Sequence, residues 1–212
     1  MQNVTRAHSD NMSNKYSTIT QNHSIISAHS HSDEHNMLPL MKITVSAGKQ
    51  TRQGVILIDS GSERTFIDAE FLNMENINAT PCRIKTVSGQ GTLYTREQTI
   101  SCRLGVNPKV LELNAQIARN FEIEMNNSKL RKILSNMEHH GLSTALDPHL
   151  QINWNQMLVC GVLGADNIKL LGDLRLREFD GLHVYQTMYG NMPFGSVKST
   201  QQSGNSLGIE SE

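Results

Sequence analysis

The stretch VILIDSGS, residues 55–62, decides how the fold of this chain is interpreted. Its four consecutive apolar residues have the length and the β-branched composition of a strand that is buried in a sheet. The strand ends at Asp59, where Ser-Gly turns the chain sharply. A carboxylate in such a place is costly unless it is hydrogen-bonded or paired. We therefore predict that the Gly61 N–H approaches this carboxylate, and that Ser60 and Ser62 support the turn.

Strand-like patterns continue on both sides of this turn, and turn residues separate them. Before the turn, residues 38–46 alternate roughly between apolar and polar side chains. After it, residues 65–67 predict a short strand, and Asp68 is expected to cap a short helix at 69–74. Further strands are expected at 83–87, 92–96, 99–104, 110–118 and 156–163. The predicted fold class is therefore mainly β.

The sequence SGQG separates the strands expected at 83–87 and 92–96, which predicts a hairpin with a glycine-rich tip. The tip consists of Ser88, Gly89, Gln90 and Gly91. We interpret it as a mobile flap that closes over a bound peptide. An ordinary hairpin tip is the alternative interpretation.

Helical patterns are found at two places. In residues 126–140, apolar side chains recur at the helical spacing i, i+3, i+4 and i+7, at Leu130, Ile133, Leu134 and Met137. Gly141 is expected to end this helix. Residues 170–176 predict a short helix or turn. The expected architecture is thus a β fold with a few helices.

The composition places the packed part of the chain between two polar ends. Of the 212 residues, 37% are hydrophobic and 5% aromatic, which is below the roughly 45–50% apolar content of globular domains. Residues 1–36 are rich in Ser, Asn and His and have no helical or strand period, so we expect a disordered arm. The Gly/Ser-rich residues 196–212 are expected to form a disordered tail. The folded domain is therefore expected at 37–195.

Charge and cysteine content argue against several classes of partner. The balance of 19 Lys+Arg against 20 Asp+Glu argues against a dedicated nucleic-acid binder. No run approaches the roughly 20 apolar residues that span a bilayer, so no membrane partner is expected. Three scattered cysteines, with no C-x-x-C pair and no secretory signal, predict reduced thiols in an intracellular, cytoplasmic setting.

Neither a metal nor another cofactor is expected. Imidazoles are good ligands for zinc or copper, and the arm contains His29, His31 and His35 close together. A metal site needs a preformed cage, however, and the arm has no core to build one. Nucleic-acid binding through the same arm ranks last, because Arg6 and Lys15 are its only fixed positive charges.

The order of the motifs resembles that of the retropepsin-type aspartic proteases. An Asp-Ser-Gly follows an apolar run, a glycine-tipped hairpin comes next, and the apolar-apolar-glycine motif Val162, Leu163 and Gly164 closes a later strand. The closer resemblance is to the peptidase domain of Pao/BEL-type retrotransposon polyproteins. The segments that carry it are ILIDSGSERTFI (56–67), TVSGQGT (86–92) and VLGADNIKLL (162–171).

The resemblance covers about residues 37–195. GLHVYQTMYGNMPFG (181–195) is similar to the segment that follows the peptidase of that family, and the insert at 119–156 matches its layout. A retropepsin-like closed β-barrel with a glycine-tipped flap, a short helix and a helical insert is the implied fold. Val162, Leu163 and Gly164 have a structural role in it.

The implied activity is that of an aspartic endopeptidase that processes a retrotransposon polyprotein, with Asp59 as its catalytic residue. Two carboxylates about 3 Å apart cannot both ionise, so they share one proton and activate a water between them. The sequence holds no second Asp-Ser-Gly or Asp-Thr-Gly. The second Asp59 is therefore expected from another copy of the chain, in a homodimer.

Three alternatives remain beside this hypothesis. Asp166 is a rival for the second carboxylate, although it is expected instead to cap the following helix. Ser60 would need a general base to act as a nucleophile, and no histidine falls in its motif. The alternative function is a catalytically inactive retropepsin-fold relic that acts as a protein-interaction module.

Overall fold

A computed structural model describes residues 35–47, 50–86, 89–121, 123–125, 130–146 and 157–197. Within these ranges the chain is mainly β, with one α-helix, α1 (Leu130–His139), and one 3-10 helix at Ile168–Leu171. The expected fold class is confirmed at this level. Apart from residues 35–36 and 196–197, the expected arm and tail lie outside the described residues, and so do His29 and His31.

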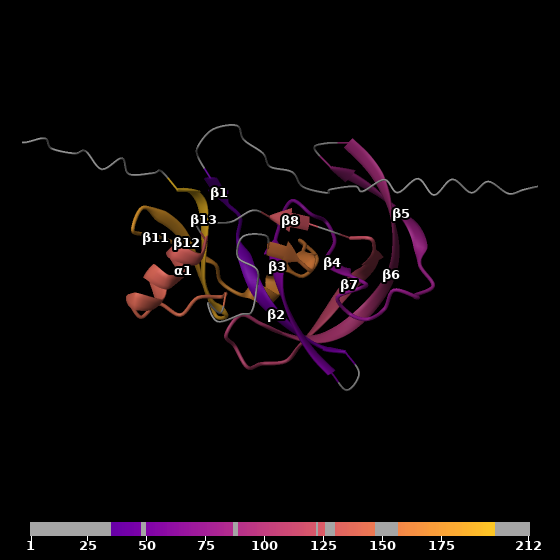
Figure 1. The fold of residues 1–212 in the computed structure, drawn as a ribbon, viewed down its shortest axis with the longest axis horizontal. Coiled ribbons are helices and arrows are strands. Elements are labelled where there is room, and N and C mark those ends of the chain that lie inside the picture. Colours follow the sequence, from indigo (N-terminus) through magenta and orange to yellow (C-terminus); the bar gives the residue numbers. More distant parts are fainter. Residues whose placement is uncertain are drawn as a thin grey trace, which may run out of the picture.

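Seven strands form a mixed sheet whose pairings close into a ring. In hydrogen-bonded order they are β2 (Leu40–Ala47), β3 (Gln50–Ile58), β10 (Gly161–Leu163), β4 (Phe66–Asp68), β7 (Leu111–Arg119), β6 (Gly89–Leu104) and β5 (Thr80–Thr86). The last residues of β6 turn back onto β2, where Ile43 lies opposite Leu104. Six strands therefore form the ring, and β5 is attached to it through β6 alone. Figure 1 shows β5, β6 and β7 curving around one side of the molecule.

The apolar run of β3 is continuous because both faces of this strand are buried. Ile56 and Ile58 belong to the main core cluster, to which all six ring strands contribute side chains. Val55 and Leu57 point to the opposite face and belong to a second cluster. A strand with one solvated face would alternate between apolar and polar residues. The central position of β3 therefore explains the sequence that precedes Asp59.

The insert expected at 119–156 covers this second face of the sheet. Leu130 and Leu134 of α1 are fully buried in the second cluster. They are joined there by Ile123 and Val159 from the two-stranded sheet of β8 (Ile123–Met125) and β9 (Met157–Val159). Gly141, at φ +70°, ends the helix as expected. Neither helix in the described ranges is long and apolar enough to cross a bilayer.

A second sheet, in the order β1 (His35–Met37), β13 (Gly190–Val197), β12 (Leu182–Thr187) and β11 (Arg175–Phe179), was not expected from local patterns. Strand pairing thus begins two residues before the expected limit of the domain and ends two residues after it. Residues 170–176 were expected to form a short helix or turn. The structure has a 3-10 helix that ends at Leu171, and residues 175 and 176 already belong to β11.

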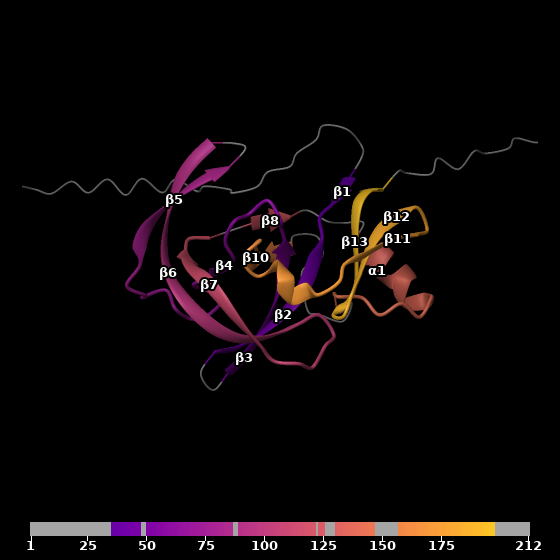
Figure 2. The ribbon, with the colours of Figure 1, turned by 180° about the vertical axis from the view of Figure 1, so that it is seen from behind.

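The two sheets share one core. Tyr189, in the turn between β12 and β13, is 1% exposed and belongs to the main core cluster. Its hydroxyl donates to the carbonyl of Leu170 at 2.7 Å. Met137 of α1 packs with Leu182 and Val184 of β12, so the helix contacts the second sheet as well. In Figures 1 and 2, α1 and β11–β13 lie at one end of the molecule and β5–β7 at the other.

The helix expected at 69–74 is wrong, although its expected cap is present. Asp68 accepts hydrogen bonds from the backbone of Glu70 and Phe71 at 3.3 and 3.0 Å. Only single turns follow, and Asn73 adopts φ +55°. The guanidinium of Arg52 donates to the carbonyls of Glu70 and Phe71 and to the Asn73 side chain. Arg52 therefore occupies carbonyls that a second helical turn would have used.

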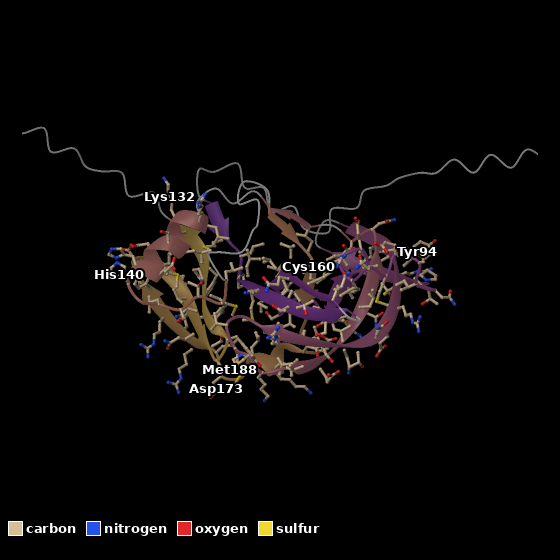
Figure 3. The ribbon with its side chains drawn as sticks, turned by 60° about the horizontal axis from the view of Figure 1, so that its bottom comes forward. Tyr94, Lys132, His140, Cys160, Asp173 and Met188 are labelled. Atoms are coloured by element: carbon tan, nitrogen blue, oxygen red, sulfur yellow. The ribbon has the colours of Figure 1, made fainter. Side chains whose placement is uncertain are left out.

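The expected strands at 92–104 and 156–163 are divided differently from the prediction. The pattern at 99–104 continues the preceding strand, so that β6 is a single strand of 16 residues. The strand expected at 156–163 is interrupted at Cys160, which separates β9 from β10. The Cys160 N–H donates to the carbonyl of Val55, and its own carbonyl accepts from the N–H of Asp68. Figure 3 shows Cys160 among the strands between the two ends of the molecule.

Candidate active site

Asp59 follows directly after β3, at the point where this strand leaves the core. Its backbone N–H donates to the carbonyl of Leu163 at 3.1 Å, and its carbonyl accepts from Ser62 at 3.2 Å. Its carboxylate oxygen Oδ1 accepts the N–H of Gly61 at 2.9 Å, which is the bond expected from the sequence. The side chain is half-buried. A carboxylate thus lies at the end of a buried strand in an orientation that a backbone donor defines.

The residues around Asp59 restrict the turn further. A Cβ atom at Gly61 would lie 3.1 Å from Asp59 Oδ1, tighter than an ordinary contact, so the missing side chain allows this approach. Ser62 donates its hydroxyl to the carbonyl of Arg64 at 2.8 Å, inside the turn. Ser60 is exposed. Of the two serines expected to support the turn, Ser62 has a hydrogen bond that does so.

β10 lies between the two strands that flank this turn. It runs parallel to β3, with Leu163 opposite Ile58, and antiparallel to β4, with Gly161 opposite Ile67. β3 and β4 therefore pair with β10 on either side rather than with each other. The Asp59 turn therefore passes over the end of β10, and the strands on both sides of the turn pair with β10.

The apolar-apolar-glycine motif of β10 follows from this insertion. Val162 and Leu163 are 3% and 0% exposed and contribute to the two clusters on opposite faces of the sheet. A Cβ atom at Gly164 would lie 2.4 Å from the backbone carbon and oxygen of Arg64. At Gly161, the same atom would lie 2.5 Å from the carbonyl oxygen of Phe66. Only glycine permits the backbone of β10 to come this close to the turn.

A buried threonine connects the end of β10 to the far side of the turn. Thr65 is fully buried, and its hydroxyl donates to Asp166 Oδ1 at 2.7 Å. The hydroxyl oxygen of Thr65 accepts from the N–H of Gly164 at 3.0 Å and from the Asn167 amide at 2.9 Å. The Thr65 N–H donates to Asp166 Oδ2 at 3.2 Å. The Asn167 amide also donates to the carbonyl of Asn114 on β7, at 2.8 Å.

Asp166 therefore has a different role from the one expected. Both of its carboxylate oxygens accept hydrogen bonds from Thr65. The N-cap residue of the following 3-10 helix is Asn167, and no side-chain bond caps that helix. Neither Thr65 nor Asn167 was predicted from the sequence as a site residue. The only available signal was a polar residue at the start of a short apolar strand, which is too common to single out.

The expected flap corresponds to the outer end of the β5–β6 hairpin. Thr86 pairs with Gly89, and residues 89–93 pair with β5 only, since the pairing of β6 with β7 begins at Tyr94. Gly89, Gln90 and Gly91 thus lie in β6, at the end of a two-stranded ribbon, whereas Ser88 lies outside the described residues. Leu93, near the base of the ribbon, belongs to the cluster of Leu57 and Val162 beside the Asp59 turn.

Burial raises the pKa of four side chains in the described ranges: Asp68, Cys102, Cys160, and Tyr189 in the turn between β12 and β13. Burial raises the pKa of Asp68, at the end of β4, and the two backbone N–H groups that it accepts partly oppose this effect. Burial also raises the pKa of the Cys160 thiol, beside β3. The Cys102 thiol on β6 has a pKa raised to about 11 by burial and by the charge of Glu112. The interior behind the site therefore disfavours charge.

His139 and His140 are not part of the Asp59 turn. His139 and His140 are exposed, at the end of α1, and the ring of His140 lies 5.6 Å from that of Phe179 on the second sheet. Figure 3 shows His140 at this end of the molecule. His149 lies outside the described residues. Ser60 therefore has no base from these positions in the described ranges.

The arrangement offers one oriented carboxylate at the end of a buried strand. One such group can donate or accept a single proton, whereas a reaction that needs an acid and a base together requires a second group. The bonds around Asp59 hold its backbone on both sides, which suits a group whose position matters.

No protein-family model matches this chain, and a search of curated proteins also found no match.

Proposed function

We propose that this protein is an aspartic endopeptidase that acts as a homodimer, with one Asp59 from each protomer. The proposal rests on the Asp59 turn: a carboxylate that directly follows the buried residues 55–58 of β3 and is oriented by the Gly61 N–H at 2.9 Å. The insertion of β10 between β3 and β4 supports it, because it keeps this turn rigid. So does the order of motifs that resembles the Pao/BEL-type peptidase domain.

The ring of six strands supports the finer description of the fold as a retropepsin-like closed barrel. The ring closes through the pairing of β6 with β2, and its strands share one core cluster. The protruding end of the β5–β6 hairpin is suited to act as the flap, since only two strands hold it. In this proposal the flap closes over a peptide bound at the Asp59 pair.

In the proposed reaction, the two Asp59 carboxylates lie close enough to share a single proton. The ionised carboxylate takes a proton from a water molecule, which attacks the carbonyl carbon of the scissile peptide bond. The protonated carboxylate gives its proton to the carbonyl oxygen. No covalent bond to the enzyme forms, so Ser60 is not needed as a nucleophile.

The second carboxylate is assigned to another copy of the chain for two reasons. The 212-residue sequence contains only one Asp-Ser-Gly. The carboxylate of Asp166, the nearest rival in the motif, accepts two hydrogen bonds from Thr65, so it already has a structural task. The proposed substrate is a polypeptide, and the resemblance points to the polyprotein of a retrotransposon.

Cleavage of a peptide library at mildly acidic pH tests this proposal. Asp59→Asn keeps the shape of the side chain but cannot act as the base, so we expect its cleavage rate to fall at least about 100-fold. Asp173→Asn is the matched control, because Asp173 is exposed and lies in the loop after the 3-10 helix, beside Met188 (Figure 3). It should cleave at the wild-type rate.

Two results would contradict the proposal. Unchanged cleavage by Asp59→Asn would remove Asp59 from the mechanism. If the wild-type protein is folded but cleaves no peptide, and Asp59→Asn does not change its fold, the inactive interaction module would be favoured instead.

A further inference from the structure

We propose that Thr65 is a positioning residue, which fixes the Asp59 turn to the end of β10 through Asp166, Asn167 and Gly164. Its catalytic consequence rests on the proposed function, whereas its effect on the turn does not. The site contains a fully buried side chain, with hydrogen bonds to a loop that is about 100 positions away in the sequence.

The hydrogen-bonding capacity of the Thr65 hydroxyl is fully used. A hydroxyl has one donor and two acceptor positions. The donor is directed to Asp166 at 2.7 Å, and the acceptor positions are taken by Gly164 and Asn167 at 3.0 and 2.9 Å. A fully satisfied buried group of this kind favours one arrangement of its partners, because every alternative leaves a polar group unpaired.

The bonds of Thr65 complete a set of cross-links between the two loops. The Asp59 N–H donates to the carbonyl of Leu163, and the N–H of Ala165 donates to the carbonyl of Ser62 at 2.8 Å. These two bonds join backbone to backbone at the start and middle of the turn. At its end, the hydroxyl of Thr65 is the group that receives the N–H of Gly164. The side chain of Thr65 therefore makes the third hydrogen-bonded connection between the two loops.

Thr65 is also held from the opposite side. Its carbonyl accepts the N–H of Gln116 on β7 at 2.8 Å. Asn167, which donates to the Thr65 hydroxyl, donates to Asn114 on the same strand as well. The end of the Asp59 turn is therefore connected to both β10 and β7. Removal of the hydroxyl would leave the Gly164 N–H and one carboxylate oxygen of Asp166 without this partner, while the apolar packing would change little.

The test compares Thr65→Val, which has nearly the same shape but no hydroxyl, with Thr65→Ser, which keeps the hydroxyl. Val184→Ala, in the core between α1 and the second sheet, is the control for a general loss of stability. Amide hydrogen exchange of Asp59, Ser62 and the β6 strand is measured in each variant. Peptide cleavage is measured in parallel, with kcat and KM determined separately.

We expect the Asp59 and Ser62 amides of Thr65→Val to exchange at least about tenfold faster than in wild type, without a similar change in β6. We expect kcat to fall roughly 10- to 100-fold with KM changed by less than about threefold, since misplacement of a reacting group affects the chemical step. Thr65→Ser should restore both properties, and Val184→Ala should change neither selectively. If Thr65→Val does not fold, Asp166→Asn is measured instead, because an amide oxygen can replace only one of the two carboxylate oxygens that accept from Thr65.

The inference fails if the turn amides of Thr65→Val and Asp166→Asn exchange as they do in wild type. It also fails if wild type and Thr65→Val have the same kcat. If wild-type protein cleaves nothing, the proposed function fails separately, and hydrogen exchange alone decides whether Thr65 positions the turn.

Discussion

Gly164, directly after β10, lies close against the backbone of the Asp59 turn. A methyl group there would lie 2.4 Å from the backbone carbon and oxygen of Arg64 and 2.9 Å from the carbonyl oxygen of Ser62. Three backbone atoms of the turn would have to move, because no flexible side chain is there to give way. The requirement for glycine is therefore one of space rather than of a positive φ angle.

We expect Gly164→Ala to lower the free energy of unfolding by about 1–3 kcal/mol or more, as overpacking of a tight site does. Denaturant unfolding measures this loss. Gly91→Ala is the matched control: the added Cβ would lie 3.5 Å from Ile84, an ordinary contact, so its effect should stay within about 0.5 kcal/mol. Equal effects of the two substitutions would mean that β10 does not approach the turn as described.

The strands and the helix that were predicted correctly are those whose sequence signals lie within their own residues. The run before Asp59 predicted β3, the SGQG tip predicted the β5–β6 hairpin, and the spacing from Leu130 to Met137 predicted α1. In each case the burial period or the turn residue lies within the element itself. These signals account for much of the main sheet.

Elements that depend on distant partners could not be predicted in this way. β10 lies within the strand expected at 156–163, but its separation from β9 and its place between β3 and β4 depend on pairings with segments about 100 positions away. β11 has four exposed residues out of five, including Arg175 and Arg177, because it is an edge strand without a buried face. In place of the short helix expected at 69–74 there are single turns, in which the carbonyls of Glu70 and Phe71 accept from Arg52 on another strand.

Within the candidate site, too, residues with a local sequence signal were predicted and residues that depend on distant partners were not. Asp59 and Gly61 were predicted because a carboxylate at the end of an apolar strand is locally unusual. Thr65 and Asn167 were missed because their importance comes from hydrogen bonds between two loops that are far apart in sequence. The expected capping role of Asp166 was wrong for the same reason: its partner Thr65 lies in the other loop.

The three cysteines differ in how deeply they are buried. Cys82 on β5 is half-buried, whereas Cys102 and Cys160 are buried. Burial raises the pKa of both buried thiols, to about 11 for Cys102. Near pH 8 these two thiols are therefore protonated and shielded, and the thiolate is the form that reacts.

We expect native protein at pH 8 to react quickly with a thiol reagent at Cys82 alone and to react at all three cysteines after denaturation. Mass spectrometry of the labelled protein measures this difference. Cys82→Ser should remove the fast reaction and leave the slow one unchanged. Fast labelling of Cys160 in native protein would mean that the contact between β10 and β3 opens readily.

In the whole molecule, the two sheets share the main core cluster and α1 packs against both sheets, yet the proposed site contains only one of the two carboxylates that the reaction needs. Tyr189 and Met192 of the second sheet are buried in the main cluster together with Ile43 and Leu104 of the ring. The segment at 181–195 is therefore part of the same folded unit as the Asp59 turn. In the proposed reaction, the second carboxylate comes from another copy of the chain, so the proposed activity depends on pairs of chains.

Mixed dimers test this dependence directly. If each active site needs one Asp59 from each protomer, a dimer of wild type and Asp59→Asn is inactive. After subunit exchange, an equal mixture should therefore have roughly a quarter of the activity of the same total concentration of wild type, because about a quarter of the dimers pair two wild-type chains. A mixture with Asp173→Asn, whose substitution lies in an exposed loop, should keep full activity. Half of the wild-type activity in the Asp59→Asn mixture would mean that each chain works alone, and it would exclude a shared pair of carboxylates.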